Sequence, residues 1–323
     1  MNKKIFIILP HKDQFIKNYA GSASIWVKDF FHKSIFKKNI MIFGSTKNTK
    51  NVFIKKNYIN INIPSIKILS KSNLYIKRLL RYCRLEKPSI IEINNRPSYL
   101  INILSNFKDA EFILVIHNDP LNLKGSTTVE ERKRLLNICH KIYFVSSWVE
   151  EKFFEGLDKN FYSNFKTIYP SINRINKFPK KNKIIIFSGK LNNAKGFDKF
   201  ASAISKILDK YSDWKAIAIG DEPRERYNFL HNRLSYTGWI PQDKVLNLYN
   251  KSSITVAPSL WEEPFGRSSL EAGSRGNAVI ISKRGGLPET ISQPIFLKKV
   301  ETKEIFSEIE NLILNKKKLK KIN

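Results

Sequence analysis

Short apolar runs alternate along the first half of the chain with longer segments in which apolar and polar residues recur at helical spacing. The runs are rich in β-branched residues and predict buried strands, while the longer segments predict amphipathic helices. Predicted strands cover residues 5–9, 40–43, 90–93, 112–116 and 141–145, and predicted helices cover 25–36, 72–85 and 128–139. This alternation is typical of βαβ units on a parallel sheet, where ligands bind beyond the carboxyl ends of the strands.

The second half repeats this rhythm after an interruption. Residues 173–183 lose the periodicity and gather Asn, Lys and Pro, which favours a linker. Predicted strands then cover residues 183–187, 215–219, 235–238, 254–256 and 278–281, with helices between them. A chain of 323 residues is large for one core. We therefore expect two Rossmann-like domains, over residues 1–172 and 184–300. An amphipathic helix at 302–314 is expected within a lysine-rich segment, 301–323.

One segment of the second half combines two carboxylates with a predicted strand, loop and helix. After the strand at 254–256 two prolines interrupt the chain, and a helix-compatible stretch begins near Gly266. Glu263 is then expected in the loop above the strand end, and Glu271 about two turns into the helix, so both can face one pocket. The opening amides of that helix, at Phe265, Gly266 and Arg267, favour a phosphate. A nucleotide-sugar needs this combination, although a surface helix with two solvated acids is the simpler alternative.

The spacing of Glu263 and Glu271, followed by Gly-Gly-Leu-Pro-Glu at 285–289, resembles the donor-site signature of retaining glycosyltransferases of family 4. Residues 117–156 are similar to bacterial members that assemble lipopolysaccharide and surface polysaccharide. The resemblance implies the GT-B fold, in which two doubly wound parallel-sheet α/β domains face each other across a cleft. It also implies a nucleotide-sugar donor, UDP-linked hexose or N-acetylhexosamine, and a glycan or lipid-linked saccharide acceptor.

The predicted second domain carries further donor-site residues of this resemblance. Gly189 and Lys190, followed by Lys195, are similar to the family's Gly-Arg-Leu and Lys-Gly segments. Gly189 would allow a sharp turn after the strand, and the two lysines would neutralise the donor diphosphate. Lys190 stands where arginine is usual, so it keeps the charge without the bidentate geometry. Gly220 matches the family's glycine-rich turn beside the nucleotide. A strand–loop–helix turn with solvated lysines is the alternative interpretation.

The catalytic residues implied by the resemblance are His117, Glu263 and Lys195. Lys195 would stabilise charge on the departing phosphate, while Glu263 and His117 would orient the donor sugar. Glu271 would accept hydrogen bonds from the ribose hydroxyls. A lone histidine is more often structural, but His117 follows a predicted strand, where ligand-binding residues gather.

The predicted first domain offers acceptor-side residues at its strand ends: Gly21, Ser22, Arg96, Asn118 and Asp119. Gly21 and Ser22 precede a predicted helix whose amino terminus would hold an acceptor or donor phosphate, as the family's glycine-containing loop does. Ser22 could equally be a helix cap, and Asp119 could cap the loop before Leu121.

Composition and charge limit the kinds of partner and the cellular location that we expect. The formal net charge of +29 attracts polyanions, yet no zinc-finger, RNP or basic-zipper pattern accompanies it, which argues against nucleic acid. Peripheral contact with an anionic membrane, near a lipid-linked acceptor, fits the charge better, and the lysines at 316–321 agree with it. No apolar stretch approaches a membrane span, and 5–9 is too short for a signal-peptide core. Cys83 and Cys139 form no metal or redox pattern, which fits a cytoplasmic protein with buried thiols.

Missing patterns exclude several other chemistries. The chain contains no Asp-x-Asp, so a divalent cation has no evident ligand and we expect neither metal nor cofactor. The glycines never fall in GxGxxG order and no Walker A sequence occurs, which disfavours an oxidoreductase and a P-loop ATPase. With the family resemblance, which implies retention of anomeric configuration, a retaining, metal-independent glycosyltransferase is the first hypothesis. A GT-B-like nucleotide-sugar epimerase and a non-catalytic nucleotide-sugar-binding protein remain as alternatives.

Overall fold

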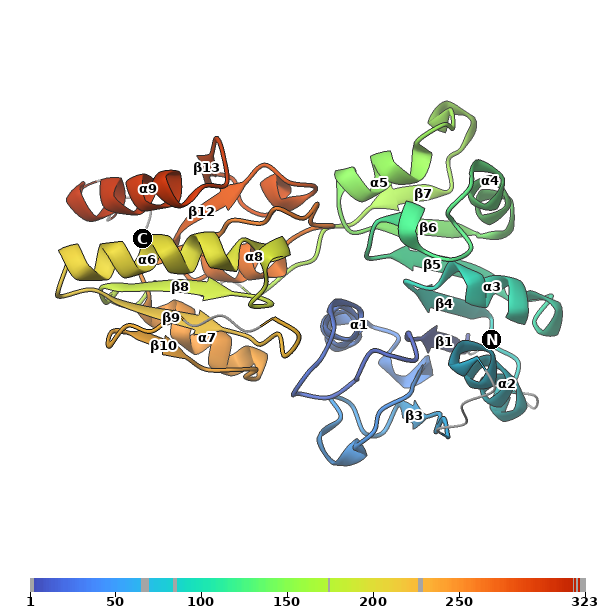
Figure 1. Ribbon diagram of the computed structural model, residues 1–323. Coiled ribbons are helices and arrows are strands. Elements are labelled where there is room, and N and C mark those ends of the chain that lie inside the picture. Colours follow the sequence, from blue (N-terminus) through green and yellow to red (C-terminus); the bar gives the residue numbers. More distant parts are fainter. Residues whose placement is uncertain are drawn as a thin grey trace. The chain divides into compact units, whose positions relative to one another are not determined.

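The computed structural model describes residues 3–64, 70–83, 86–173, 175–225, 229–315, 317 and 319. The chain divides into two compact units, Met1–Pro170 and Ser171–Asn323. Each unit is built on one parallel sheet (Figure 1).

The first unit contains a seven-stranded sheet of order β3-β2-β1-β4-β5-β6-β7, in which all neighbours are parallel. The strands are β1 (Ile5–Ile8), β2 (Ile40–Gly44), β3 (Tyr58–Asn60), β4 (Ile90–Asn94), β5 (Glu111–Ile116), β6 (Lys141–Phe144) and β7 (Phe165–Thr167). The five predicted strands are confirmed to within one residue at each end. β3 and β7 escaped prediction because each has only three residues and lies at a sheet edge, with little buried apolar surface.

The helices of the first unit include three at the predicted amphipathic segments and several that were not predicted. They are α1 (Ser22–Lys33), η1 (Lys37–Asn39), η2 (Thr49–Asn51), α2 (Lys71–Cys83), α3 (Pro97–Ile103), η3 (Leu104–Asn106), η4 (Pro120–Asn122), α4 (Val129–Ile138), α5 (Ser147–Phe154) and η5 (Lys159–Phe161). α4 starts as predicted because Thr128 and Glu131 form a capping box. α1 begins and ends three residues earlier than predicted, since Ser34 leaves the helical conformation with ψ of 137°. Leu85, the expected end of α2, lies outside the described residues.

The second unit contains a six-stranded parallel sheet of order β10-β9-β8-β11-β12-β13. Its strands are β8 (Ile184–Ser188), β9 (Lys215–Ile219), β10 (Leu234–Tyr236), β11 (Ile254–Ala257), β12 (Ala278–Ser282) and β13 (Ile295–Leu297). Its helices are η6 (Asn193–Lys195), α6 (Phe197–Lys210), α7 (Gln242–Lys251), α8 (Arg267–Gly273), η7 (Leu287–Glu289) and α9 (Thr302–Leu314). The predicted strands are confirmed to within one residue, except that β10 ends two residues before the end predicted for the strand at 235–238. The helix at 302–314 is confirmed, and β13 is an addition.

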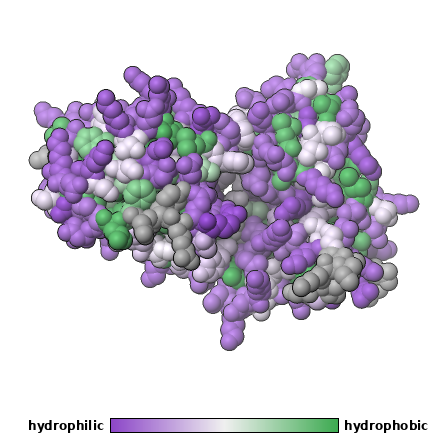
Figure 2. Space-filling model, viewed as in Figure 1, coloured by the Kyte–Doolittle hydropathy of each residue, from purple (hydrophilic) through white to green (hydrophobic). Residues whose placement is uncertain are grey.

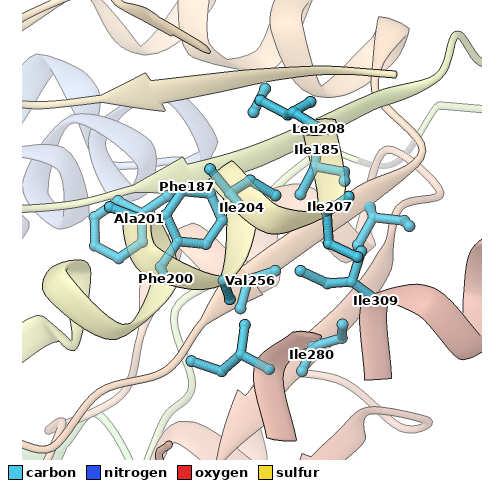
Figure 3. Close-up of a cluster of buried hydrophobic side chains, with 14 of the residues drawn as sticks. Ile185, Phe187, Phe200, Ala201, Ile204, Ile207, Leu208, Val256, Ile280 and Ile309 are labelled. Carbon is cyan, nitrogen blue, oxygen red and sulfur yellow. The ribbon is translucent and has the colours of Figure 1, made fainter. Parts of the chain in front are cut away.

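Alternate strand residues of the second unit enter two different hydrophobic clusters, as the two-residue period of a strand requires. Ile185 and Phe187 pack with α6 and α9, whereas Ile186 packs on the opposite face with α7 and α8. α6 and α9 lie side by side, and Ile309 of α9 meets the cluster formed by Ile204 and neighbouring residues of α6 (Figures 1 and 3). Burying each such side chain contributes about 1.5–3 kcal/mol to folding, so α9 completes the core of its own unit.

The segment predicted as a linker is hydrogen-bonded to the second unit. The backbone N–H of Asn182 donates to the carbonyl of Lys251 at 2.8 Å, and Arg275 donates to the carbonyl of Asn173 at 2.8 Å. Lys181 donates to the carbonyl of Tyr249 at 3.0 Å. These bonds fix both ends of the segment on the second unit.

Two further expectations concern burial and membrane crossing. Both cysteines are buried, as expected, and burial raises the pKa of the Cys83 and Cys139 thiols to about 12. Within the described part of the chain, no helix has the length and apolar character that crossing a membrane requires. The lysines expected at 316, 318, 320 and 321 lie outside the described residues.

Candidate functional site

Each parallel sheet has one point where the strand order changes direction, and the loops that follow the strands there are the usual ligand-binding positions of such folds. In the second unit this point lies between β8 and β11. Gly189 and Lys190 follow β8, and the loop with Glu263 follows β11. In the first unit it lies between β1 and β4, so His11 and Arg96 follow the two strands concerned.

Lys195 and Glu263 form an ion pair at this edge of the second sheet. The Lys195 ammonium donates to Glu263 Oε1, and the two side chains are 28% and 13% exposed. Lys195 is positioned by η6, where the Asn192 side chain accepts a bond from the Lys195 N–H at 3.0 Å. Two of the three predicted catalytic residues are therefore in direct contact, in a partly buried setting that strengthens their electrostatic interaction.

Backbone hydrogen bonds hold the Glu263 loop on both sides. The N–H groups of Leu260 and Trp261 donate to the Ala194 carbonyl, both at 2.9 Å, which ties the loop to η6. The Gly286 N–H donates to the Glu263 carbonyl at 2.7 Å. A side-chain carbon at Gly285 would lie 2.2 Å from the Glu263 carbonyl oxygen, so only glycine fits there. The predicted Gly-Gly segment thus positions the Glu263 backbone.

Gly189 and Gly220 meet where β8 and β9 end. The Gly189 N–H donates to the Ile219 carbonyl at 2.9 Å, and Gly220 has a φ of 125°. A side-chain carbon at Gly220 would lie 1.9 Å from the Gly189 carbonyl oxygen. These two predicted residues share one close backbone contact, which requires glycine at 220.

Glu271 is buried with polar partners. Gln242 Nε2 donates to Glu271 Oε1 at 2.6 Å, and Arg267 lies 3.6 Å from the same oxygen. Because α8 begins at Arg267, Glu271 lies about one turn into the helix, and the expected two turns were wrong. Gly266, with a φ of 102°, precedes α8, and the neighbouring Phe265 is buried.

Cationic side chains surround the ends of β8 and β9. Lys190 is exposed beside Gly189. Arg224 holds both oxygens of Glu222 at 2.7 Å, and this pairing lowers the pKa of Glu222 to about 2, with a smaller contribution from the charge of Lys190. Glu225 accepts a bond from the Asn193 N–H at 2.9 Å, which connects this loop to η6.

His117 is buried at the end of β5, within a chain of hydrogen bonds in the first unit. Its Nε2 lies 2.9 Å from Asn94 Oδ1, and Asn94 Nδ2 donates to Glu92 Oε1 at 2.8 Å. Since the amide nitrogen of Asn94 faces the carboxylate, its oxygen faces the imidazole, which assigns a proton to Nε2 of His117. Burial raises the pKa of Glu92. The rings of Trp26 and His117 pack in a T-shaped arrangement, with centroids 5.5 Å apart.

Asn95 organises the loop that follows His117. Its φ of 55° is one of two positive values at non-glycine positions in the described part of the chain, and asparagine tolerates this conformation better than most residues. The Asn95 Oδ1 accepts bonds from the N–H groups of His117 and Asn118, both at 3.1 Å. His117, Asn118 and the neighbouring Arg96 are thereby brought to one edge of the sheet.

The amino terminus of α1 holds a carboxylate from its own unit. Asp13 accepts bonds from the Gly21 N–H at 2.8 Å and from the Ser24 N–H at 3.1 Å. Burial raises the pKa of Asp13, and these amides partly offset that effect. Asp13 therefore occupies amides of this terminus that an incoming phosphate would need. Ser22 is the first residue of α1 and Gly21 is its N-cap.

Asp119 caps η4, as its alternative interpretation allowed. Its side chain accepts bonds from the Leu121 N–H at 3.0 Å and from Asn122 Nδ2 at 2.8 Å. Arg96 precedes α3, and among the described residues its buried Nε has no hydrogen-bond partner. Near Arg96, burial and the positive charges of Arg96, Lys12 and Lys71 lower the pKa of His11 to about 4.

Sequence reasoning missed several residues that fix these sites: Asp13, Asn94, Gln242, Glu262 and His11. Glu262 accepts a bond from the Gly285 N–H at 2.6 Å and pairs with Arg284 at 2.9 Å. The backbone N–H of His11 donates to the Tyr99 hydroxyl at 3.2 Å, and the ring Nδ1 of His11 lies 2.7 Å from the same oxygen. Position after a strand could have singled out His11, and adjacency to Glu263 could have singled out Glu262.

No group of three or more His, Cys, Asp or Glu side chains able to hold a metal ion occurs within the part of the chain that the structure describes.

Two parallel-sheet α/β units with these strand orders define the GT-B fold, and the resemblance to solved structures agrees. A crystal structure of Anabaena Alr3699/HepE in complex with UDP and glucose superposes with a TM-score of 0.76 at 16% identity, covering 99% of this chain and 92% of that one. The expected fold is confirmed.

Residues 169–323 match the family Glycosyl transferases group 1, so the second unit carries a domain of this family. Among curated relatives, spore coat protein SA of Bacillus subtilis is 23% identical over 242 residues, covering 63% of this chain and 62% of that protein. The putative glycosyltransferase YtcC of Bacillus subtilis is 25% identical over 237 residues, covering 64% and 58%. The chain thus spans about three-fifths of the length of these relatives.

Proposed function

We propose that this chain is a retaining glycosyltransferase of the family-4 type, which transfers a hexose or N-acetylhexosamine from a UDP-sugar to a glycan or lipid-linked saccharide. The observation that carries the proposal is the Lys195–Glu263 pair, held at the change of strand order by loops that require glycine at 220 and 285. A cation beside a carboxylate at this edge suits a ligand with a diphosphate next to a sugar.

In this proposal the second unit binds the donor. Departure of the nucleoside diphosphate places negative charge on phosphate, which Lys195 and Lys190 stabilise. An ammonium has three donors, so Lys195 can bind phosphate while keeping its bond to Glu263. Glu263 then accepts hydrogen bonds from the sugar hydroxyls, and Glu271, held by Gln242, accepts them from the ribose. Residues 189, 220 and 265–267 border the diphosphate with their backbone.

The first unit supplies the acceptor side and His117. The Asn94 bond fixes the imidazole so that it orients the donor sugar. Gly21, Ser22, Arg96, Asn118 and Asp119 are the acceptor-side residues of the proposal. Of these five residues, Arg96 carries the positive charge. The Asp13 carboxylate at Gly21 favours acceptor hydroxyls over a phosphate at that position. The leaving phosphate accepts the acceptor's proton, and no metal takes part.

The choice of donor nucleotide and of pathway rests on similarity to other proteins. Anabaena Alr3699/HepE has been crystallised with UDP and with UDP-glucose, which supports testing UDP-sugars first. The similarity of residues 117–156 to lipopolysaccharide and surface-polysaccharide enzymes supports that pathway. We place the protein in the cytoplasm, in peripheral contact with the inner face of the membrane, where such acceptors are built.

The test is incubation of the protein with radiolabelled UDP-, GDP- and ADP-sugars, with and without a lipid-linked or oligosaccharide acceptor and with EDTA present. Transfer to acceptor in EDTA, with retained anomeric configuration, is the expected result. Isomerisation of the sugar without acceptor identifies an epimerase instead, and saturable binding without turnover identifies a binding protein.

A further inference from the structure

The positive charge of this chain is unevenly distributed. Residues 30–85 contain thirteen lysines and arginines and no aspartate or glutamate, the longest acid-free stretch of the sequence. This stretch forms the end of α1, strands β2 and β3 and helix α2, so it makes up the β3-β2 edge of the first unit. Basic side chains gathered in one part of a unit attract an extended anionic partner more strongly than scattered charges do.

Two apolar side chains are exposed within this edge. Ile35 is 89% exposed and Phe36 is 50% exposed, in the turn between α1 and η1. They are the only consecutive pair among the large hydrophobic side chains exposed in the described residues. On the face drawn in Figure 2, hydrophilic residues cover most of the surface and hydrophobic ones are scattered. Exposing a β-branched and an aromatic side chain together is costly in water unless a partner covers them.

Exposed lysines flank this pair. Lys33 precedes it, and Lys37 and Lys38 follow it directly. Lys55 and Lys56, exposed on the next turn, are brought to the same place by Asn57. Its amide donates to the carbonyls of Lys37 at 3.0 Å and Ile40 at 2.8 Å. We call residues 33–38 with 55–56 the basic turn patch.

The backbone of this patch is fixed. The Ser34 N–H donates to the Phe30 carbonyl at 2.8 Å, and the Phe36 N–H donates to the Ser34 hydroxyl at 3.0 Å. The Asn39 N–H donates to the Phe36 carbonyl at 2.8 Å. A fixed turn presents its side chains without an ordering cost on binding. The basic turn patch precedes β2 and therefore lies at the amino-terminal ends of the parallel strands. His117 follows β5 and lies at their carboxyl-terminal ends.

We propose that the basic turn patch docks the first unit on an anionic lipid surface, with Ile35 and Phe36 entering the headgroup region and the lysines contacting lipid phosphates. Apolar side chains flanked by lysines suit a bilayer interface, where both kinds of contact are made at once. A nucleic-acid backbone would use the lysines but offers little to an isoleucine.

This inference gives a location to the membrane contact in the proposed function, but it can be tested without turnover. The full chain is sedimented with neutral phosphatidylcholine vesicles and with vesicles containing phosphatidylglycerol, at low and high salt. We expect binding to the anionic vesicles only, weakened by salt. Lys33→Glu/Lys37→Glu/Lys38→Glu should weaken it by about 100-fold or more, since each lysine near an anionic surface is worth about fivefold.

The apolar pair has its own test and control. Ile35→Ser/Phe36→Ser should weaken vesicle binding about tenfold or more. Phe161→Ser changes a side chain that is 82% exposed in the same unit, beside Asp158, and should leave binding unchanged. Circular dichroism verifies that the variants are folded. Equal binding to neutral vesicles, an equal loss in the Phe161 variant, or tighter binding to a DNA or RNA duplex that is insensitive to residues 35 and 36 would overturn the proposal.

Transfer to a soluble oligosaccharide, measured without vesicles, separates the two proposals. If the patch variants keep wild-type transfer and lose vesicle binding, both proposals are supported. Transfer with no binding to anionic vesicles contradicts the docking surface alone, whereas binding without transfer to any acceptor contradicts the proposed activity alone.

Discussion

The two units hold their candidate residues in different ways. In the second unit the Lys195–Glu263 pair is held by backbone hydrogen bonds and by glycines whose positions exclude any side chain. In the first unit His117 is held by side chains, through Asn94 and Asn95. Backbone contacts demand particular residues in short contiguous segments, whereas side-chain networks can be assembled from distant positions in many ways.

This difference explains where recognition from sequence succeeds. The matched family covers residues 169–323, which includes the whole second unit and none of the first unit's strands. A position that lies against a backbone carbonyl admits only glycine, so it can be recognised in the sequence. In the first unit, which we propose binds the acceptor, His117 is instead held by the side chains of Asn94 and Asn95.

The largest effect is expected at the ion pair. Lys195→Ala or Glu263→Ala should lower transfer by about 10³-fold or more, because each removes a charged group that acts where charge develops. Folding should be retained, since both side chains are partly exposed. The matched control is Lys183→Ala, which removes an exposed ion pair with Asp213 on the same unit. Full activity in both site variants would remove the assignment.

The next largest effect is expected from replacing a glycine that lies against a backbone carbonyl. Gly285→Ala forces a carbon to 2.2 Å from the Glu263 carbonyl oxygen at a φ of 58°, and should lower the free energy of unfolding by about 3 kcal/mol or more. Gly238→Ala is the control, because φ is 64° there but nothing lies within 4 Å. Its cost should be about 1 kcal/mol. Denaturant titration measures both, and equal losses would mean that backbone strain, rather than the close approach, decides.

His11 should make stability depend on pH. Its native pKa of about 4 lies below the usual 6.5, so between these values the unfolded chain binds a proton that the native state does not. Stability then rises with pH across this window and is lost as pH falls, by up to about 3 kcal/mol. His11→Gln keeps a group that can bond Tyr99 and should flatten the dependence. If the free energy of unfolding of His11→Gln depends on pH between 4 and 6.5 as steeply as that of the wild type, a buried, neutral His11 imidazole is contradicted.

The smallest effect should follow from loosening His117. Asn94→Leu removes the bond to Nε2 and the bond to Glu92, and should lower kcat about tenfold with a shifted pH–rate profile. Asn102→Ala, which removes an exposed amide bond to the Ser98 carbonyl on α3, is the control. If kcat and its pH profile stay the same, His117 is structural.

The sequence predicted the fold well because short, β-branched apolar runs that alternate with helical segments leave few alternatives to a parallel sheet. It failed at β3, β7 and β13, where three residues with little burial carry no periodicity. In the candidate site, Gly285 and Lys195 could be predicted because contiguous segments contain them. Asp13, Asn94 and Gln242 could not, because only the folded chain places them beside Gly21, His117 and Glu271.

The most direct test is calorimetric titration of UDP into the full chain and into its Lys195→Ala and Lys183→Ala variants. Saturable binding to the wild type, at least tenfold weaker in Lys195→Ala and unchanged in Lys183→Ala, is the predicted result. Equal affinity in all three proteins would contradict a diphosphate site at the Lys195–Glu263 pair.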